Sequence, residues 1–220
     1  MGGGPGTGTV GILLAGGRGS RLGLEIPKAM ARVGGRTLLE RAIETLSPCC
    51  DVVVVAAPRN LAFIVPARAA NGRDVLRASD VGDGPLGGVT AALGVARRAR
   101  AVILGVDFPL MRYEMLDALL ARLAYAGAGD AAPPAVVPSP DGVLQPLAAA
   151  YAWSTLEALA EAHGRGERSI VAAVGDLGPR VLTEQELADL PGGLENFLNL
   201  NRPADLIRAE QRLVARSAAR

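Results

Sequence analysis

Residues 10–28 read VGILLAGGRGSRLGLEIPK, an apolar run followed by a glycine-rich turn and a Pro-Lys pair. The apolar run, Val10 to Ala15, has the length of a β-strand, and continuous apolar runs are typical of inner strands buried on both faces. Gly16 and Gly17 end the run abruptly. The stretch therefore predicts a buried strand whose carboxyl end leads directly into a glycine-rich loop.

The composition of this loop indicates a site for a triphosphate. Its glycines have no Cβ, so the backbone N–H groups can approach a phosphate closely. Lys28 is the only lysine in the chain against 22 arginines. Lysine is a compact point charge on a flexible stem, suited to follow a phosphate as charge moves. We expect a nucleotide to bind along Ala15, Gly16, Gly17, Arg18, Gly19, Ser20 and Lys28, with Arg21 and Lys28 as catalytic cations.

Other interpretations of the loop receive less support from the residues. A tight turn with solvated charges is the simplest, because glycine-rich turns after strands are common. A P-loop requires GxxxxGK[ST], but Lys28 is not preceded by glycine or followed by Ser or Thr. A dinucleotide fold requires GxGxxG opening a helix, whereas Gly17, Gly19 and Gly23 give GxGxxxG and Pro27 delays any helix. The loop therefore favours a triphosphate over NAD.

The composition of the whole chain is that of one α/β domain. At 220 residues it is long enough for one sizeable core, and we expect a single domain over residues 9–220 after a disordered glycine-rich leader at 1–8. Half of the residues are apolar but only 3% are aromatic, which suits α/β layering. A net charge of +1 with mixed acids and bases gives no sign of a nucleic-acid partner. No run reaches the length of a membrane span, and we expect a cytoplasmic protein.

The residue types that usually build metal or redox sites are scarce. Cys49 and Cys50 are adjacent, and adjacent cysteines form a disulfide only with strain. His163 is the only histidine, so the sequence holds no Cys/His set for zinc. We expect the cysteines to be small buried residues before the second strand, and His163 to be solvated in a polar loop.

Hydrophobic periodicity predicts strands that alternate with helices. Strands are expected over residues 10–15, 52–56, 74–78, 101–106, 136–137 and 144–150. Helices are expected over residues 37–46, 61–70, 89–98, 111–125, 153–162 and 169–174, with a last helix ending near residue 216. Thr37 stands where an N-cap of the first helix is needed.

A second glycine-rich loop, DVGDGPLGG at residues 80–88, follows a predicted strand and opens a helix. A plain turn and a nucleoside site are both open interpretations, because acids beside glycines also accept hydrogen bonds from a base or ribose. The candidate nucleotide-binding residues of this loop are Asp80, Gly84, Pro85 and Leu86.

Asp107 stands at the carboxyl end of a predicted buried strand, in the segment VDFPL. A carboxylate at such a place is costly unless it is paired or binds a metal. In an open α/β sheet, the carboxyl ends of the strands are also where ligands bind. We therefore favour Asp107 as a ligand of Mg²⁺ over Asp107 as a simple helix cap.

Taken together, these motifs resemble those of the molybdenum cofactor guanylyltransferases and related molybdopterin nucleotidyltransferases. The LAGGRGSRLG loop, the GPLGG and VDFPL segments and the terminal FLNLNRPADL follow the family's order through nearly the whole chain. The resemblance implies a three-layer α/β/α Rossmann-like fold with a mostly parallel sheet. It also implies that GTP is held by Leu14, Gly16, Gly17 and Lys28, the nucleoside by Asp80, Mg²⁺ by Asp107, and the acceptor side by Asn199 and Asn201.

The reaction implied is Mg²⁺-dependent transfer of GMP from GTP to molybdopterin, with release of pyrophosphate. The spacing from Gly23 to Lys28 is closer to that of cytidylyl and sugar-phosphate enzymes, so another base, or a sugar phosphate or methylerythritol phosphate as acceptor, remains an alternative. A non-catalytic nucleotide-binding regulatory protein is the alternative from another class. The expected partners are a nucleoside triphosphate and a phosphorylated small molecule, the latter bound by residues 127–145, in a monomer or small homo-oligomer.

Overall fold

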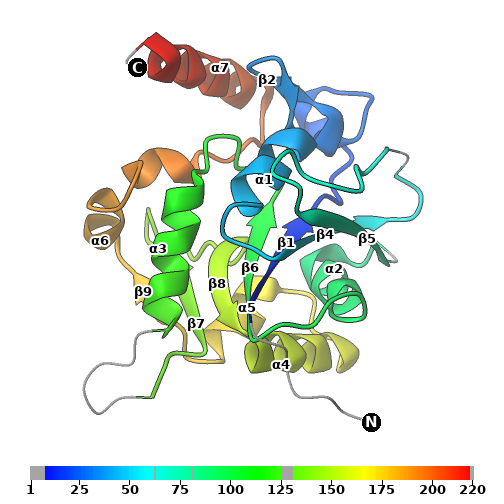
Figure 1. Cartoon of the computed structure of the whole chain (residues 1–220), viewed down its shortest axis with the longest axis vertical. Coiled ribbons are helices and arrows are strands. Elements are labelled where there is room, and N and C mark those ends of the chain that lie inside the picture. Colours follow the sequence, from blue (N-terminus) through cyan, green and yellow to red (C-terminus); the bar gives the residue numbers. More distant parts are fainter. Residues whose placement is uncertain (1–7, 62, 81, 125–130, 219–220) are drawn as a thin grey trace.

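The computed structural model describes residues 8–61, 63–80, 82–124 and 131–218, and its centre is a seven-stranded sheet (Figure 1). The strands, in the order β5-β4-β1-β6-β8-β7-β9 across the sheet, are β1 (Thr9–Leu14), β4 (Val52–Pro58), β5 (Asp74–Asp80), β6 (Arg100–Gly105), β7 (Ala135–Pro138), β8 (Ala148–Ala152) and β9 (Arg180–Leu182). Within this sheet β8 runs against the other strands, because it pairs antiparallel with β6 and β7 while the remaining pairs are parallel. The mostly parallel sheet implied by the resemblance is confirmed.

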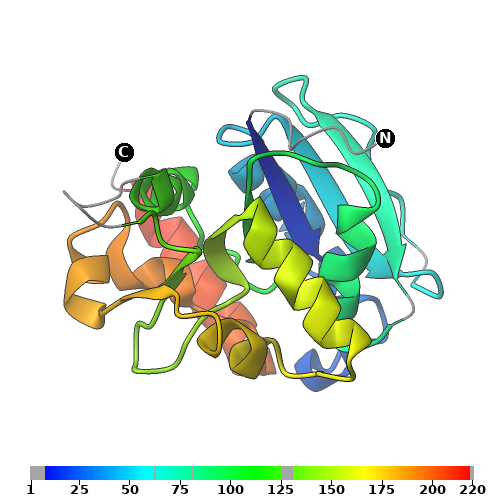
Figure 2. The ribbon, with the colours of Figure 1, turned by 90° about the horizontal axis from the view of Figure 1, so that it is seen from below.

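Helices cover both faces of the sheet and make three layers (Figures 1 and 2). One face packs against α1 (Leu38–Leu46) and α3 (Tyr113–Ala124), and the other against α2 (Gly84–Leu93), α4 (Trp153–Gly164) and α5 (Ile170–Gly175). Successive strand residues point to opposite faces, so Leu13 joins the first core and Ile12 joins the second. The α/β/α fold expected from the sequence is confirmed.

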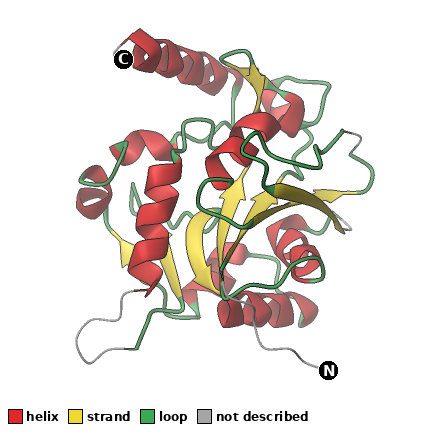
Figure 3. Ribbon diagram, viewed as in Figure 1, coloured by secondary structure: helices red, strands yellow, loops and turns green. Residues whose placement is uncertain are grey.

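The remaining elements lie around these layers. They are the hairpin β2 (Arg32–Val33) and β3 (Arg36–Thr37), the 3₁₀ turns η1 (Ser20–Leu22), η2 (Lys28–Met30) and η3 (Gly193–Phe197), and the helices α6 (Glu184–Ala188) and α7 (Pro203–Ala218). Helix α7 packs against β2 at the top of the molecule as drawn in Figure 3, so the end of the chain returns to the segment after the glycine-rich loop. Over the described residues, no helix is both long and apolar enough to cross a membrane.

The topology gathers the predicted loops at one edge of the sheet. Strands β1, β4, β5 and β6 are neighbours and run parallel, so their carboxyl ends lie together. Strand β1 continues into the glycine-rich loop, β5 into the loop that precedes α2, and β6 into the loop that carries Asp107. Ligands of open α/β sheets bind at this edge.

Two expected elements differ from the structure for local reasons. Residues 61–70 are not helical where they are described, and the amide of Ala69 instead donates to Arg73 O in a turn. The strand expected from residue 144 begins only at Ala148. Pro146 has no N–H to give to a ladder, which explains the late start.

The boundaries of two helices also differ from those expected, and some expected residues lie outside the described part of the chain. Helix α2 begins at Gly84 rather than at residue 89, because Pro85 suits the first turn of a helix, and it ends at Leu93 rather than at residue 98. Helix α3 begins at Tyr113 rather than at residue 111. Residues 1–7 of the expected leader, residue 125 of the helix expected over residues 111–125 and residues 127–130 of the expected acceptor segment lie outside the described residues.

The adjacent cysteines are free thiols in the loop before β4. Their Sγ atoms are 3.9 Å apart, Cys50 is buried and Cys49 is partly buried. The contact with the Cys49 thiol and burial both raise the pKa of Cys50, which keeps that thiol protonated and unreactive.

Helix α1 begins at the N-cap Thr37, as the sequence predicts, and the cap forms a capping box with Glu40. The amide of Glu40 donates to Thr37 Oγ1 at 3.1 Å, and the amide of Thr37 donates to Glu40 Oε2 at 2.7 Å. Thr37 is buried, so water cannot replace these bonds. The box fixes the start of a helix that covers the core beside β1.

Replacing Thr37 by Ala is expected to lower the free energy of unfolding by about 1 kcal/mol, the usual cost of losing an N-cap. Urea unfolding followed by circular dichroism measures this change. The matched control is Thr37→Ser, which keeps the hydroxyl acceptor and should lose less stability. Equal losses in both variants would show that the methyl group, and not the cap, is responsible.

Candidate active site

The glycine-rich loop is closed by its own backbone hydrogen bonds. The amide of Lys28 donates to Gly17 O at 2.9 Å, and that of Leu24 donates to Gly19 O at 3.2 Å. Gly19 has a φ of +79°, and a Cβ there would lie 2.4 Å from the carbonyl oxygen of Ile26. The path of the loop therefore requires glycine at residue 19.

Lys28 and Asp107 face each other although they are 79 residues apart in sequence. Nζ of Lys28 lies 3.3 Å from Oδ2 of Asp107, and the two side chains are only 14% and 21% exposed. Gly17 allows this approach, because a Cβ on it would lie 3.2 Å from Cδ of Lys28. A partly buried ion pair thus joins the loop after β1 to the loop after β6.

The other carboxylate oxygen of Asp107, Oδ1, is buried and receives no hydrogen bond from the described residues. Gly105 leaves the space for this atom, since a Cβ there would lie 2.3 Å from it. The described residues contain no cluster of three acidic, His or Cys side chains that could hold a metal alone. A single carboxylate with a free oxygen suits Mg²⁺, which usually takes one or two carboxylates and completes its shell with water and substrate phosphates.

Two cavities meet at this ion pair. The first, of about 290 Å³, is lined among the predicted residues by Leu14, Gly16, Gly17, Lys28, Asp80, Gly84, Pro85 and Asp107. The second, of about 310 Å³, is lined by Gly17, Arg18, Gly19, Ser20, Arg21, Lys28, Asp107 and Asn201. Gly17, Lys28 and Asp107 line both cavities, so the cavities adjoin at the ion pair.

The carboxylate of Asp80 forms one wall of the first cavity and is 8% exposed. Its Oδ1 accepts a hydrogen bond of 2.6 Å from the amide of Gly82, which has a φ of +82°. Gly88 keeps the wall open, because a Cβ there would lie 2.8 Å from Cδ2 of Leu14 and 3.5 Å from Oδ2 of Asp80. No side chain at residue 88 therefore stands between Oδ2 of Asp80 and the cavity.

Three predicted site residues line neither cavity. Ala15 is buried and its amide donates to Ala56 O at 2.9 Å, while Leu86 is on the buried face of α2. These two residues support the loops and their side chains do not reach the cavities. Asn199 has a buried Oδ1 that receives no hydrogen bond from the described residues. It precedes Leu200, whose amide donates to Asp107 O at 3.0 Å.

The only histidine does not lie in a solvated loop, contrary to the expectation from sequence. His163 is in the last turn of α4, where its Nε2 lies 3.0 Å from Oδ2 of Asp83 and its Nδ1 lies 3.3 Å from Oγ1 of Thr90. Nε of Arg168 lies 3.2 Å from the other oxygen of Asp83. These contacts fix α2 and the glycine loop before it against α4, which lies beside α2 in both views (Figures 1 and 2). The sequence gives no local sign of these contacts, because His163 and Asp83 are 80 residues apart.

The chain is similar to known proteins over most of its length. Residues 11–178 match the MobA-like NTP transferase domain. The chain belongs to the MobA-like NTP transferase family. A probable molybdenum cofactor guanylyltransferase of Chloroflexus aggregans is 35% identical over 206 residues, covering 89% of this chain and 90% of that protein. A molybdenum cofactor guanylyltransferase of Pseudomonas putida is 36% identical over 194 residues, covering 88% and 95%.

Solved structures agree with this membership. The molybdopterin-guanine dinucleotide biosynthesis protein A of Archaeoglobus fulgidus has a TM-score of 0.69 at 26% identity, covering 94% of this chain and 99% of that chain. The 2-C-methyl-D-erythritol 4-phosphate cytidylyltransferase of Thermus thermophilus shares the fold, with a TM-score of 0.61 at 22% identity over 94% and 98% of the chains. This MobA-like family member is a molybdenum cofactor guanylyltransferase-like nucleotidyltransferase, which confirms the enzyme class expected from its motifs.

Gly105→Ala is expected to lower kcat/KM by about 10²-fold, because the new Cβ would displace the carboxylate of Asp107 and small misplacements in a site have effects of that size. Pyrophosphate release measures the loss. Gly175→Ala is the matched control, since a Cβ there meets no atom within 4 Å and activity should stay at the wild-type level. An active Gly105→Ala enzyme would contradict a requirement for Asp107 in this position.

Proposed function

We propose that the chain transfers GMP from GTP to the phosphate of the molybdopterin cofactor and releases pyrophosphate. The activities named for its relatives support this proposal. The observation that carries it is the position of the Lys28–Asp107 pair at the junction of two cavities, one beside Asp80 and one beside the arginines of the loop. We place the reaction in the cytoplasm and expect a monomer or small homo-oligomer.

In the proposed reaction, an oxygen of the acceptor phosphate forms a bond to the α-phosphorus of GTP. The bond from the α-phosphorus to the pyrophosphate oxygen breaks, and pyrophosphate leaves with the electron pair. A phosphate monoester is already anionic at neutral pH, so no general base has to remove a proton. This agrees with a site in which the only histidine, His163, is held by Asp83. Rate acceleration then rests on positioning and charge neutralisation.

Each part of the site has a role in this proposal. The nucleoside occupies the first cavity, and the triphosphate extends along the backbone amides of the glycine-rich loop. Lys28 contacts the phosphates at the junction, while Arg18 and Arg21 stabilise their charge in the second cavity. The acceptor approaches from the side of Asn201, which also lines the second cavity, with Asn199 behind it.

We propose that Asp107 holds Mg²⁺ through Oδ1, the buried oxygen without a hydrogen-bond partner. When bound, this ion would neutralise charge on the phosphates. Lys28 already holds Oδ2, so it fixes the direction in which Oδ1 points. The chain thus supplies one rigid oxygen ligand.

Recognition of guanine is proposed to rest on acceptors at the ends of β1 and β5. Guanine offers the N1–H and N2–H₂ donors, which need buried acceptors. Leu14 O already accepts from the amide of Val106 at 3.1 Å and keeps one lone pair. Oδ2 of Asp80 completes the candidate set, and Ala15 is left out of it because this residue does not line the cavity. A site of this kind rejects bases without those donors, because its acceptors would stay unpaired.

Asp107→Asn is expected to abolish turnover while the fold stays intact, because an amide cannot replace the charge of the carboxylate toward a divalent cation. Pyrophosphate release and the thermal unfolding curve together measure the two effects. Asp117→Asn, on the exposed side of α3, is the control and should keep full activity. Wild-type turnover by Asp107→Asn would exclude this residue from the reaction.

GTP with Mg²⁺ is expected to raise the melting temperature more than CTP does at equal concentration, because the tighter ligand stabilises the folded state more by mass action. Asp80→Ala should narrow the difference, since it removes one acceptor of the base. Thermal unfolding with each nucleotide tests both expectations. A larger shift with CTP in the wild-type protein would overturn the choice of guanine and leave the nucleotidyltransferase assignment in place.

A further inference from the structure

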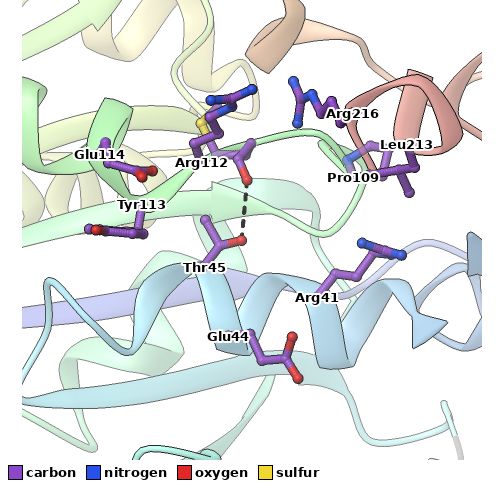
Figure 4. A pocket seen from close by; sticks show the side chains of 10 residues that line it. Arg41, Glu44, Thr45, Pro109, Arg112, Tyr113, Glu114, Leu213 and Arg216 are labelled. Atoms are coloured by element: carbon purple, nitrogen blue, oxygen red, sulfur yellow. Dashed lines mark hydrogen bonds between the residues drawn. The ribbon is translucent and has the colours of Figure 1, made fainter. Parts of the chain in front are cut away.

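A cavity of about 560 Å³ lies away from the proposed nucleotide site, between α1, the start of α3 and α7 (Figure 4). None of the residues that line it lines either of the two cavities at the Lys28–Asp107 pair. Its volume is in the range of small-molecule sites in proteins.

Three arginines from three different elements line this cavity. Arg41 comes from α1, Arg112 immediately precedes α3, and Arg216 comes from α7. In Figure 4 the side chains of Arg112 and Arg216 lie across the cavity from Arg41. Guanidinium groups are the side chains best suited to bind phosphate oxygens through paired hydrogen bonds.

Two of these guanidinium groups are held in place by other contacts. Arg41 donates from Nη2 to Gly34 O at 3.1 Å and from Nε to Val33 O at 2.5 Å. The carboxylates of Glu44 and Glu210 also act on it electrostatically without a hydrogen bond to it. Arg216 donates from Nη1 to Leu110 O at 2.9 Å and pairs with Glu195 at 3.0 Å. Both groups keep free N–H donors in fixed positions.

Arg112 is the third cation, and its side chain makes no hydrogen bond or ion pair to the described residues. Two acidic side chains also line the cavity, and neither forms an ion pair with Arg112. Glu44 is paired with Arg36 outside the cavity and points away from Arg112 in Figure 4. Glu114 is exposed at the rim. The guanidinium of Arg112 therefore has no ion-pair partner among the described residues.

The same cavity borders the loop that carries Asp107. Thr45 Oγ1 donates to Met111 O at 3.3 Å, the bond that is dashed in Figure 4. Arg216 holds the carbonyl of Leu110, and the amide of Arg112 donates to the buried Asn196 at 2.8 Å. A ligand in this cavity would thus contact the segment that begins at the proposed metal ligand.

We propose that this cavity is a second anion site, which binds a diphosphate group through Arg41, Arg112 and Arg216. The enzyme's own reaction class releases inorganic pyrophosphate, so a ligand of this chemistry is present wherever the enzyme works. The volume of the cavity is larger than one phosphate group occupies. A diphosphate has enough oxygens to accept hydrogen bonds from all three guanidinium groups. The site would fill as product accumulates.

The test is calorimetric titration of the full chain with inorganic pyrophosphate in the absence of divalent metal. The wild-type protein is expected to bind two equivalents, one at the glycine-rich loop and one in the cavity of Figure 4. Arg112→Gln should lose the second equivalent or weaken it at least tenfold, because the substitution removes the only one of the three cations that has no structural partner. Thermal unfolding checks that the variant is folded.

The matched control is Arg165→Gln, at the C-cap of α4 and outside this cavity, which should keep both equivalents. Lys28→Ala should weaken only the other equivalent, so a failure of the proposed nucleotide site is distinguishable from a failure of this one. Identical binding by wild type and Arg112→Gln, or a single wild-type equivalent that only Lys28→Ala weakens, would overturn the second site.

Discussion

The ion pair between Lys28 and Asp107 connects the two loops on which the site is built, and it does so at a cost in stability. Both side chains are largely withdrawn from water, and desolvation of a pair often exceeds the attraction it gains. Asp107 recovers little of this cost, because its second oxygen is buried without a partner. A buried carboxylate oxygen without a partner destabilises the folded state, but it can bind a ligand of opposite charge. Functional sites commonly break the requirement for satisfied polar groups that the rest of a domain obeys.

The glycines of this site are as important as its charged residues, because they have no side chains. Gly19 gives the loop a backbone path that a Cβ would block, Gly17 admits the stem of Lys28, and Gly105 admits the carboxylate of Asp107. The ends of β1 and β6 are neighbours in the sheet, so the space left at Gly17 and Gly105 lets Lys28 and Asp107 meet between the two loops. The geometry of the Lys28–Asp107 pair therefore depends on the absence of side chains at these glycines.

Features that depend on neighbouring residues were predictable from sequence, and features that depend on distant ones were not. The strands ended by Gly16 and Asp107 and the cap at Thr37 follow from local apolar runs and turn residues. The weak pattern at residues 61–70 predicted a helix, but the chain there turns back toward β5. The contact of His163 with Asp83 left no local signal, since neither residue type by itself shows which partner lies 80 residues away.

The C-terminal part of the chain holds the loop that carries Asp107 in place. The family domain covers residues 11–178, yet the loop that carries Asp107 is also held from beyond that range. Leu200 donates to Asp107 O, Asn196 accepts from the next segment of the loop, and Arg216 binds the carbonyl before it. A loop fixed at its first and last residues by one C-terminal segment cannot shift without moving that segment. The carboxylate of Asp107 and the proposed acceptor side at residues 199–201 are therefore positioned as one unit.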